Sequence, residues 1–234
     1  MAGTEVRVLT EIGEAEAQDP YLLSPSEQSA LLAGHPWSRF AVVGDSIGLG
    51  MGDPTEGYLT ATWGERIAAA LARERDDLVY LNLAQHGATA AEIRDGQLGQ
   101  AVDFEPDLVA VVGGGNDVLA EEFDLAAVRG AIDEIVATLS GSGATVVSYE
   151  LLDFGHAFPD PAFQELSRRL QSLYAAMREI ARDRRTVHVD LSAEPWAREP
   201  YCFSADLKHP TMRAQAYCAS ATVRALGEHL RRGA

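Results

Sequence analysis

Five short runs rich in valine and leucine alternate with longer helical patterns from residue 37 onward, and this alternation most constrains the fold. The runs span residues 39–44, 78–83, 107–113, 144–149 and 186–190. Continuous apolar runs are typical of strands that are covered on both faces, as in parallel sheets. Strands that alternate with helices require right-handed crossover connections. The sequence therefore predicts an α/β fold, in which helices cover both faces of a parallel sheet.

Helical patterns occupy residues 63–75, 125–140, 160–184 and 211–231. Asp124 is a favourable N-cap for the second pattern, and Pro161 suits the first turn of the third. Residues 1–36 precede the alternation and contain an acidic stretch, followed by a short helical pattern at 26–33. We therefore expect an N-terminal extension with a short helix over 1–36, followed by one domain over 37–234.

The acidic composition restricts the possible partners. The 234 residues include 19 Lys and Arg against 35 Asp and Glu, which gives a formal net charge of −16. Nucleic acid and anionic membrane surfaces would be repelled, so neither is an expected partner.

The sequence begins without a basic and apolar leader, and it has no apolar run of about 18 residues. With two cysteines in the chain, we expect a cytoplasmic protein with reduced thiols, whose oligomeric state is open.

Glycine-rich and polar segments follow the predicted strands. The carboxyl ends of parallel strands share one edge of the sheet, and ligands bind there in open α/β sheets. Ser46 follows the first strand in the turn Gly44-Asp45-Ser46-Ile47-Gly48. The position suits a nucleophile, because glycines permit a sharp turn and a close approach of substrate. Turns are also rich in these residue types for conformational reasons alone.

A serine nucleophile needs a base within hydrogen-bond reach, and His209 is the best candidate among six histidines. Asp206 lies three residues before it, just ahead of the last helical pattern. This spacing would let the carboxylate hold the second imidazole nitrogen and fix its tautomer. The alternative is that both residues only cap the helix.

A tetrahedral intermediate also needs hydrogen-bond donors directed at its oxyanion. Candidates are the side-chain amide of Asn116, on the glycine-rich loop after the third strand, and the backbone N–H groups of Gly87 and Ser46. The three glycines at 113–115 also suit a tight turn or a phosphate cradle. A cradle usually has Lys or Arg nearby, whereas Asn116 and Asp117 come next.

Together these segments resemble the four motif blocks of the SGNH hydrolase family, also called the GDSL esterase/lipase family. Gly44-Asp45-Ser46 is similar to the first block, with Ile47 where the name motif has Leu. The other blocks correspond to Asn82–Gly87, Gly114–Asp117 and Asp206–His209. The resemblance spans about residues 37–230, and its general style looks like that of actinobacterial members.

The resemblance implies a three-layer, flavodoxin-like fold with a five-stranded parallel sheet in the order 2-1-3-4-5. It implies that Ser46 is the nucleophile, His209 the base and Asp206 the residue that orients it. It also implies an oxyanion hole made by the N–H groups of Ser46 and Gly87 and by the Asn116 amide. No metal or organic cofactor is expected.

The implied reaction is cleavage of a carboxylic ester with a small or medium acyl group, through an acyl-enzyme on Ser46. A small-molecule acyl ester is thus the expected partner. An acyltransferase in intracellular metabolite or natural-product biosynthesis would use the same acyl-enzyme. A catalytically idle binding protein on the same fold is a third hypothesis.

Loops around the predicted site are expected to select the substrate. Candidate pocket residues follow the fourth strand or precede Asp206, where side chains could line a cleft or simply pack the loops onto the sheet. They are Asp153, Phe154, His156, Trp196, Tyr201 and Phe203. Met51, Pro54 and Tyr58, after the nucleophile turn, and His86, beside Gly87, are further candidates.

Overall fold

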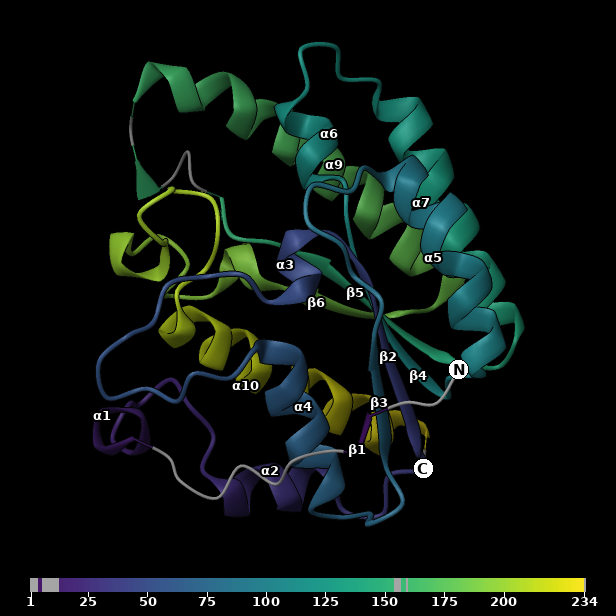
Figure 1. Cartoon of the computed structure of the whole chain (residues 1–234), viewed down its shortest axis with the longest axis vertical. Helices are drawn as coiled ribbons and strands as arrows, with labels where there is room; N and C mark the ends of the chain where they lie inside the picture. The colour runs from purple at the N-terminus through teal and green to yellow at the C-terminus, as the bar shows by residue number, and fades with distance from the viewer. Residues whose placement is uncertain (1–3, 6–12, 154–156, 159, 234) are drawn as a thin grey trace.

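A central sheet lies between helices on both of its faces (Figure 1). The computed structural model describes residues 4–5, 13–153, 157–158 and 160–233. Within these residues, the parallel strands are β2 (Arg39–Gly44), β3 (Val79–Asn82), β4 (Leu108–Val112), β5 (Thr145–Glu150) and β6 (Val187–Asp190). They are ordered β3-β2-β4-β5-β6, which is 2-1-3-4-5 along the chain. The predicted fold class and strand order are confirmed.

A sixth strand, β1 (Thr4–Glu5), pairs antiparallel with β3 at the edge of the sheet. This strand is not predicted from the sequence, because two residues without an apolar run carry no strand signal. The segment expected to be an extension thus contributes a strand to the central sheet.

The described helices begin and end close to the predicted patterns where a pattern was recognised. They are α1 (Glu14–Ala17), α2 (Pro25–Leu32), α3 (Ser46–Leu49), α4 (Trp63–Ala72), α5 (Ala90–Phe104), α6 (Gly115–Leu119), α7 (Leu125–Gly141), α9 (Pro161–Arg184) and α10 (Met212–Gly233). Helix α5 was not predicted, since glycines interrupt its sequence. Its start carries a capping box, in which Thr89 and Glu92 satisfy each other's backbone N–H groups, and this signal could have identified it.

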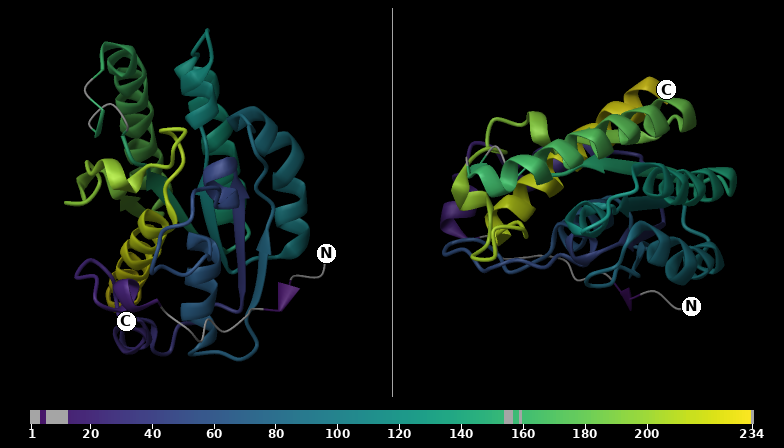
Figure 2. Two further views of the ribbon diagram at one scale, coloured as in Figure 1. Left: turned by 60° about the vertical axis from the view of Figure 1, so that its left-hand side comes forward. Right: turned by 90° about the horizontal axis from the view of Figure 1, so that it is seen from above.

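Successive residues of β2 face opposite layers of the core, as the pleat of a strand requires. Phe40 and Val42 belong to the apolar cluster that includes residues of α4 and α10. Ala41 and Val43 belong to the cluster formed with α5 and α7. Figure 2 shows the sheet between these two layers of helices. Since both faces of the strand are buried, its sequence is a continuous apolar run. None of the helices in the described part of the chain is both long and apolar enough to cross a membrane.

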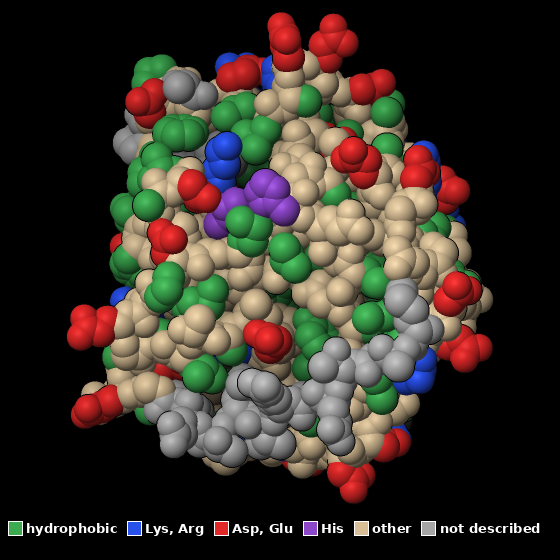
Figure 3. Space-filling model, in the orientation of Figure 1, with side chains coloured by type: hydrophobic (Ala, Val, Ile, Leu, Met, Phe, Trp, Pro, Cys, Tyr) green, Lys and Arg blue, Asp and Glu red, His purple; other side chains and the backbone are tan. Residues whose placement is uncertain are grey.

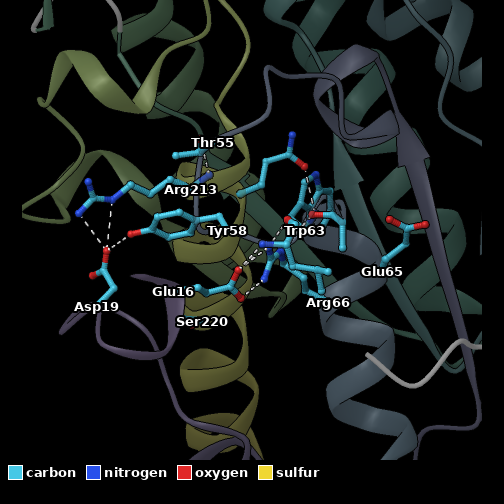
Figure 4. Close-up of polar contacts among 12 residues, drawn as sticks. Glu16, Asp19, Thr55, Tyr58, Trp63, Glu65, Arg66, Arg213 and Ser220 are labelled. Carbon is cyan, nitrogen blue, oxygen red and sulfur yellow. Dashed lines mark hydrogen bonds and ion pairs between the residues drawn. The ribbon is translucent and has the colours of Figure 1, made fainter. Parts of the chain in front are cut away.

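Residues 13–36 pack against α4 and α10 and share their core. Leu32 is fully buried in the cluster on that face of the sheet. Two carboxylates of the segment make buried polar contacts with the rest of the domain (Figure 4). Glu16 forms an ion pair with Arg66 of α4, with 2.5 Å between Oε1 and Nη1, and Glu16 Oε2 accepts a hydrogen bond from the Leu59 N–H.

Asp19 makes the second of these contacts. Its Oδ2 accepts hydrogen bonds from the Tyr58 and Tyr217 hydroxyls and from the guanidinium of Arg213. Burial raises the pKa of Asp19, but the hydrogen bonds from Tyr217 and Tyr58, together with the charge of Arg213, outweigh burial and lower it. The segment is therefore held to α10 and to the loop before α4 by an ionised carboxylate.

We expect Glu16→Gln to destabilise the fold by about 3 kcal/mol, because it leaves the buried guanidinium of Arg66 without a compensating charge. The two side chains of this pair are only 6% and 9% exposed. The free energy of unfolding in urea measures the effect. Glu228→Gln is the matched control, since its pair with Arg232 is exposed and should contribute less than about 0.5 kcal/mol. If both variants lose the same small amount of unfolding free energy, the ion pair of Glu16 does not stabilise the fold as proposed.

Candidate active site

Ser46 is the first residue of α3, at the carboxyl end of β2. Asp45 caps this helix, and its Oδ1 accepts a hydrogen bond from the Ile47 N–H at 2.9 Å. The backbone N–H and C=O of Gly44 both bond to the buried amide of Gln97, at 2.8 Å each. A Cβ on Gly44 would lie 2.4 Å from the Val112 carbonyl oxygen, so only glycine fits there. The turn that carries Ser46 is therefore fixed on several sides.

His209 and Asp206 lie on the loop that leads into α10. Ser46 Oγ is 2.8 Å from His209 Nε2, and His209 Nδ1 is 2.5 Å from Asp206 Oδ2. With the Nδ1 proton donated to the carboxylate, the Nε2 lone pair accepts the serine hydroxyl proton. The three side chains thus form one continuous line of hydrogen bonds, although Ser46 and His209 are 163 residues apart in the chain.

The loop between Asp206 and His209 is tightly wound. Leu207 adopts a positive φ of 60°, which is uncommon for a residue with a side chain. Asp206 Oδ1 accepts hydrogen bonds from the N–H groups of Lys208 and His209, at 3.0 and 3.1 Å. Burial raises the pKa of Asp206, but the hydrogen bonds from the His209 side chain and from these N–H groups prevail and hold it at about 2. Asp206 is therefore ionised at neutral pH and can stabilise an imidazolium.

Two polar residues that the sequence analysis did not single out hold this loop against the nucleophile turn. Asp53 accepts a hydrogen bond from the Ala205 N–H through Oδ2, and its own N–H donates to Ser204 Oγ, both at 2.8 Å. Gln215 of α10 is fully buried, and its Nε2 donates to the carbonyl oxygens of Gly50 and Pro210. No local motif marks either residue, because their partners are distant in sequence.

The candidate oxyanion residues lie on two neighbouring loops. Gly87, on the loop after β3, has a φ of 78° that favours glycine. Asn116 is the second residue of α6, and its amide nitrogen donates to the Ala88 carbonyl oxygen at 3.0 Å. Asp117 accepts a hydrogen bond from the Ala90 N–H at 2.9 Å, which joins α6 to the start of α5. The Asn116 amide and the loop of Gly87 are therefore held next to each other.

Asn82, at the end of β3, joins the second loop to the nucleophile helix. Its Nδ2 donates to the Gly48 carbonyl oxygen and its Oδ1 accepts from the Ala84 N–H, at 3.0 Å each. The residues that the sequence analysis drew from four separate blocks thus meet at one edge of the sheet.

A cavity of about 230 Å³ opens beside Ser46 and His209. Its inner wall is apolar and mostly buried, with Leu151 and Leu152 half-buried, and it draws on β5, α9, α4, α10 and the loops after β5 and β6. Residues of this wall are Trp63, Tyr149, Leu151, Leu152, Leu170, Tyr174, Leu191 and Cys218. The lining also includes Asn116 and three exposed residues, His86, Leu119 and Lys208. Figure 3 shows histidine side chains reaching the surface on this face.

Four of the pocket residues expected from the sequence do not line the cavity. Asp153 is buried and accepts hydrogen bonds from Ser167 and Gln171. Trp196 packs on Tyr217 in the core, and Phe203 packs on Phe158. Tyr201 is exposed and stacks with the guanidinium of Arg213. None of these four is among the residues that line the cavity.

The remaining candidates are placed as follows. Phe154 and His156 lie outside the described residues. Met51, Pro54 and Tyr58, after the nucleophile turn, are not among the residues that line the cavity, and Tyr58 contacts Asp19 in the N-terminal segment. His86, beside Gly87, lines the cavity. The cavity wall instead draws on residues of strands, helices and the loops after β5 and β6, many of which look like ordinary core in the sequence. Within the described ranges, no group of three or more His, Cys, Asp or Glu side chains could hold a metal ion.

Comparison with known proteins gives one family and several similar structures. The model of the GDSL-like lipase/acylhydrolase family matches residues 42–217. A search of curated protein sequences returned no match.

Three solved structures illustrate the structural likeness. LAE5, an α/β-hydrolase enzyme from the metagenome of Lake Arreo, Spain, is 20% identical with a TM-score of 0.66, covering 83% of this chain and 96% of its own. A lipase/acylhydrolase from Enterococcus faecalis is 16% identical with a TM-score of 0.65, covering 82% and 96%. A catalytic mutant of Axe2, an acetylxylan esterase from Geobacillus stearothermophilus, is 16% identical with a TM-score of 0.68, covering 83% and 95%. At these identities the likeness supports the fold.

The buried carboxyl of Asp45 predicts a dependence of stability on pH. Burial raises its pKa from 3.8 to about 6, against the opposing effect of hydrogen bonds from the Ile47 and Gly48 N–H groups. The folded state therefore binds this proton more tightly than the unfolded state. The resulting stabilisation is present below about pH 4 and is lost as the pH rises through about 6.

We expect Asp45→Asn, which keeps the capping oxygen, to raise Tm by roughly 6 °C at pH 8 and by less than about 2 °C at pH 4. Thermal unfolding of both proteins at the two pH values measures this. The comparison between variant and wild type cancels the titration of all other groups. A difference in Tm that is the same at both pH values would show that Asp45 does not titrate in this range.

Proposed function

The chain belongs to the GDSL-like lipase/acylhydrolase family, and on this basis we propose that it is a serine esterase that forms an acyl-enzyme on Ser46. The observation that carries the proposal is the hydrogen-bonded line of Ser46, His209 and Asp206 at the wall of an apolar cavity. A serine hydroxyl alone is a weak nucleophile, and an oriented base at 2.8 Å supplies what it lacks.

In the proposed mechanism, His209 Nε2 takes the hydroxyl proton as Ser46 Oγ attacks the ester carbonyl. Asp206 holds Nδ1–H, which keeps the ring in the required tautomer and stabilises the imidazolium. The tetrahedral intermediate collapses when His209 gives the proton to the leaving alcohol. A water molecule, activated by the same imidazole, then releases the acyl group and restores Ser46.

The oxyanion that forms in both steps would be bound by the N–H groups of Ser46 and Gly87 and by the Asn116 amide. An amide nitrogen carries two N–H groups, and one of those of Asn116 already donates to the Ala88 carbonyl oxygen. That bond holds the side chain in place and leaves the second N–H for the substrate. Donors that are fixed before the reaction stabilise developing charge without reorganisation.

The cavity supports a small or medium acyl group. Its volume of about 230 Å³ lies below the range of about 300–1,000 Å³ typical of pockets for drug-sized ligands. The aromatic and leucine side chains of its inner wall would bury a hydrocarbon chain, and each methylene removed from water contributes about 0.8 kcal/mol. The proposed substrates are therefore carboxylic esters of short- to medium-chain acids.

We expect Ser46→Ala to lower kcat/KM for p-nitrophenyl esters by about 10³-fold or more, because the variant cannot form an acyl-enzyme. A fluorophosphonate should add to Ser46 in the wild type and not in the variant, as intact-mass analysis shows. Ser142→Ala, at the exposed end of α7, is the matched control and should keep full activity. Full activity in Ser46→Ala would disprove the mechanism, and a wild type inert to esters and probe would favour the idle binding protein.

Product analysis in the same assay addresses the acyltransferase alternative, which shares the acyl-enzyme. Graded concentrations of an alcohol or an amine are added, and the acylated acceptor is measured against the free acid. Free acid as the main product at all acceptor concentrations supports hydrolysis. Preferential formation of the acylated acceptor would identify a transferase.

We expect Asn116→Ala to lower kcat by about 10²- to 10³-fold with a small change in KM, since an oxyanion donor acts mainly in the transition state. Steady-state kinetics with one p-nitrophenyl ester measures both constants. Thermal unfolding checks that loss of the bond to the Ala88 carbonyl has not unfolded the loop. An unchanged kcat in a folded variant would remove Asn116 from the proposed oxyanion hole.

A further inference from the structure

We propose that the mouth of the cavity binds an anionic group, a carboxylate or a phosphate, on the leaving-group side of the substrate, and that Lys208 supplies the cation. The inference rests on the proposed ester cleavage at Ser46 and names the class of alcohol that leaves. Three observations support it: the lysine content of the chain, the pairing of its charged side chains, and the difference in polarity and exposure between the two ends of the cavity.

Lys208 is the only lysine in the 234 residues, since the other 18 basic residues that accompany it are arginines. It lies between Asp206 and His209 and lines the cavity that Ser46 and His209 also line. A protein with a net charge of −16 thus places its one lysine at the mouth of the cavity. An ammonium group on a flexible stem is a hydrated point charge that suits contact with a mobile anion.

The ammonium group of Lys208 is free to accept a ligand. In the described part of the chain it forms no ion pair within 4.0 Å and no side-chain hydrogen bond, and only its backbone N–H is bonded. The neighbouring carboxylate of Asp206 is already occupied by His209 and by two backbone N–H groups. Arg66 and Arg213, by contrast, are paired with Glu16 and Asp19.

The two ends of the cavity differ in a way that assigns the anion to the leaving group. The inner wall is apolar and mostly buried, and a charge placed there without a partner would be strongly destabilised. His86 and Lys208, at the mouth, are exposed. The leaving oxygen must lie within reach of His209 Nε2 to be protonated, one residue from Lys208 in the chain. The acyl chain therefore occupies the apolar end, and the alcohol extends past Lys208.

Electrostatic screening makes this local charge effective in spite of the acidic surface. The Debye length at physiological ionic strength is about 8 Å, so distant carboxylates are largely screened. A contact at the mouth is closer than this and keeps most of its strength. One cation in an otherwise acidic surrounding would thus discriminate between anionic and neutral alcohols.

The test uses butyryl esters that differ in the group opposite the scissile bond: 4-butyryloxybenzoate, 4-butyryloxyphenyl phosphate and methyl 4-butyryloxybenzoate. The readout is kcat/KM for each anionic ester divided by kcat/KM for the neutral one. Comparing this ratio between variants cancels the intrinsic reactivity of the esters. The benzoate and the phosphate arms distinguish the two sources of the anion.

We expect Lys208→Met to lower the ratio by up to about fivefold, mainly through KM, as for a partly exposed charge contact. Lys208→Glu should lower it further, because it places a like charge at the mouth. Arg231→Met is the matched control: it removes one positive charge at the exposed far end of α10, roughly 30 Å away at 1.5 Å per residue. It should leave the ratio unchanged.

The inference is overturned if the ratio is the same in the wild type, Lys208→Met and Lys208→Glu while Ser46 still hydrolyses the neutral ester. It is also overturned if Arg231→Met lowers the ratio as much as Lys208→Met does, since net charge alone would then explain it. Failure of the proposed function looks different: none of the esters is hydrolysed, and a fluorophosphonate does not label Ser46.

Discussion

The candidate site depends on the contact between two loops that are far apart in sequence, and the buried amide of Gln215 is central to this contact. Its Oε1 accepts a hydrogen bond from the Trp63 N–H, while its Nε2 donates to the Gly50 and Pro210 carbonyl oxygens. A Cβ on Gly52 would lie only 1.9 Å from the Pro210 oxygen, so the loops meet at backbone contact. A buried amide that lost these partners would be strongly destabilising, because unsatisfied polar groups cost about 1–3 kcal/mol each. The position of the imidazole against the serine rests on this junction.

Three carboxylates lie around this junction, and their pKa values and hydrogen-bond partners differ. Asp206 accepts the side-chain and backbone N–H groups of His209, and its pKa falls to about 2 in spite of partial burial. Asp45 lies in the wall of the cavity with few donors, and burial raises its pKa to about 6. Asp53 joins the nucleophile loop to the base loop through the Ala205 N–H. Burial, opposed in Asp45 by two backbone N–H groups and in Asp206 by one side-chain and two backbone N–H groups, therefore leaves the carboxyl beside Ser46 with a higher pKa than the one beside His209.

An element of the fold can be predicted from the sequence when its signal is local, that is, when it lies in the residues of the element themselves. The strands of the parallel sheet were found because both of their faces are buried, which leaves a continuous apolar run. Helix α5 was missed because glycines weaken its pattern, and β1 because two residues carry no pattern. The segment 13–36 reads as an extension in the sequence, but Leu32, Glu16 and Asp19 tie it to α4 and α10. The ion pairs of Glu16 and Asp19 join residues 50 and 194 positions apart, which no local pattern records.

The sequence by itself determined the fold class and drew Ser46, Asn116 and His209 from separate blocks at the ends of predicted strands or before the last helix. This was possible because a turn, a strand end and a hydrogen-bonding side chain each leave a local mark. Only the tertiary structure decided which residues form the cavity, because a wall residue such as Tyr149 and a core residue such as Trp196 are both large, apolar and buried. They differ only in whether neighbours fill the space beside them, and that depends on how β5, α9 and α10 approach one another.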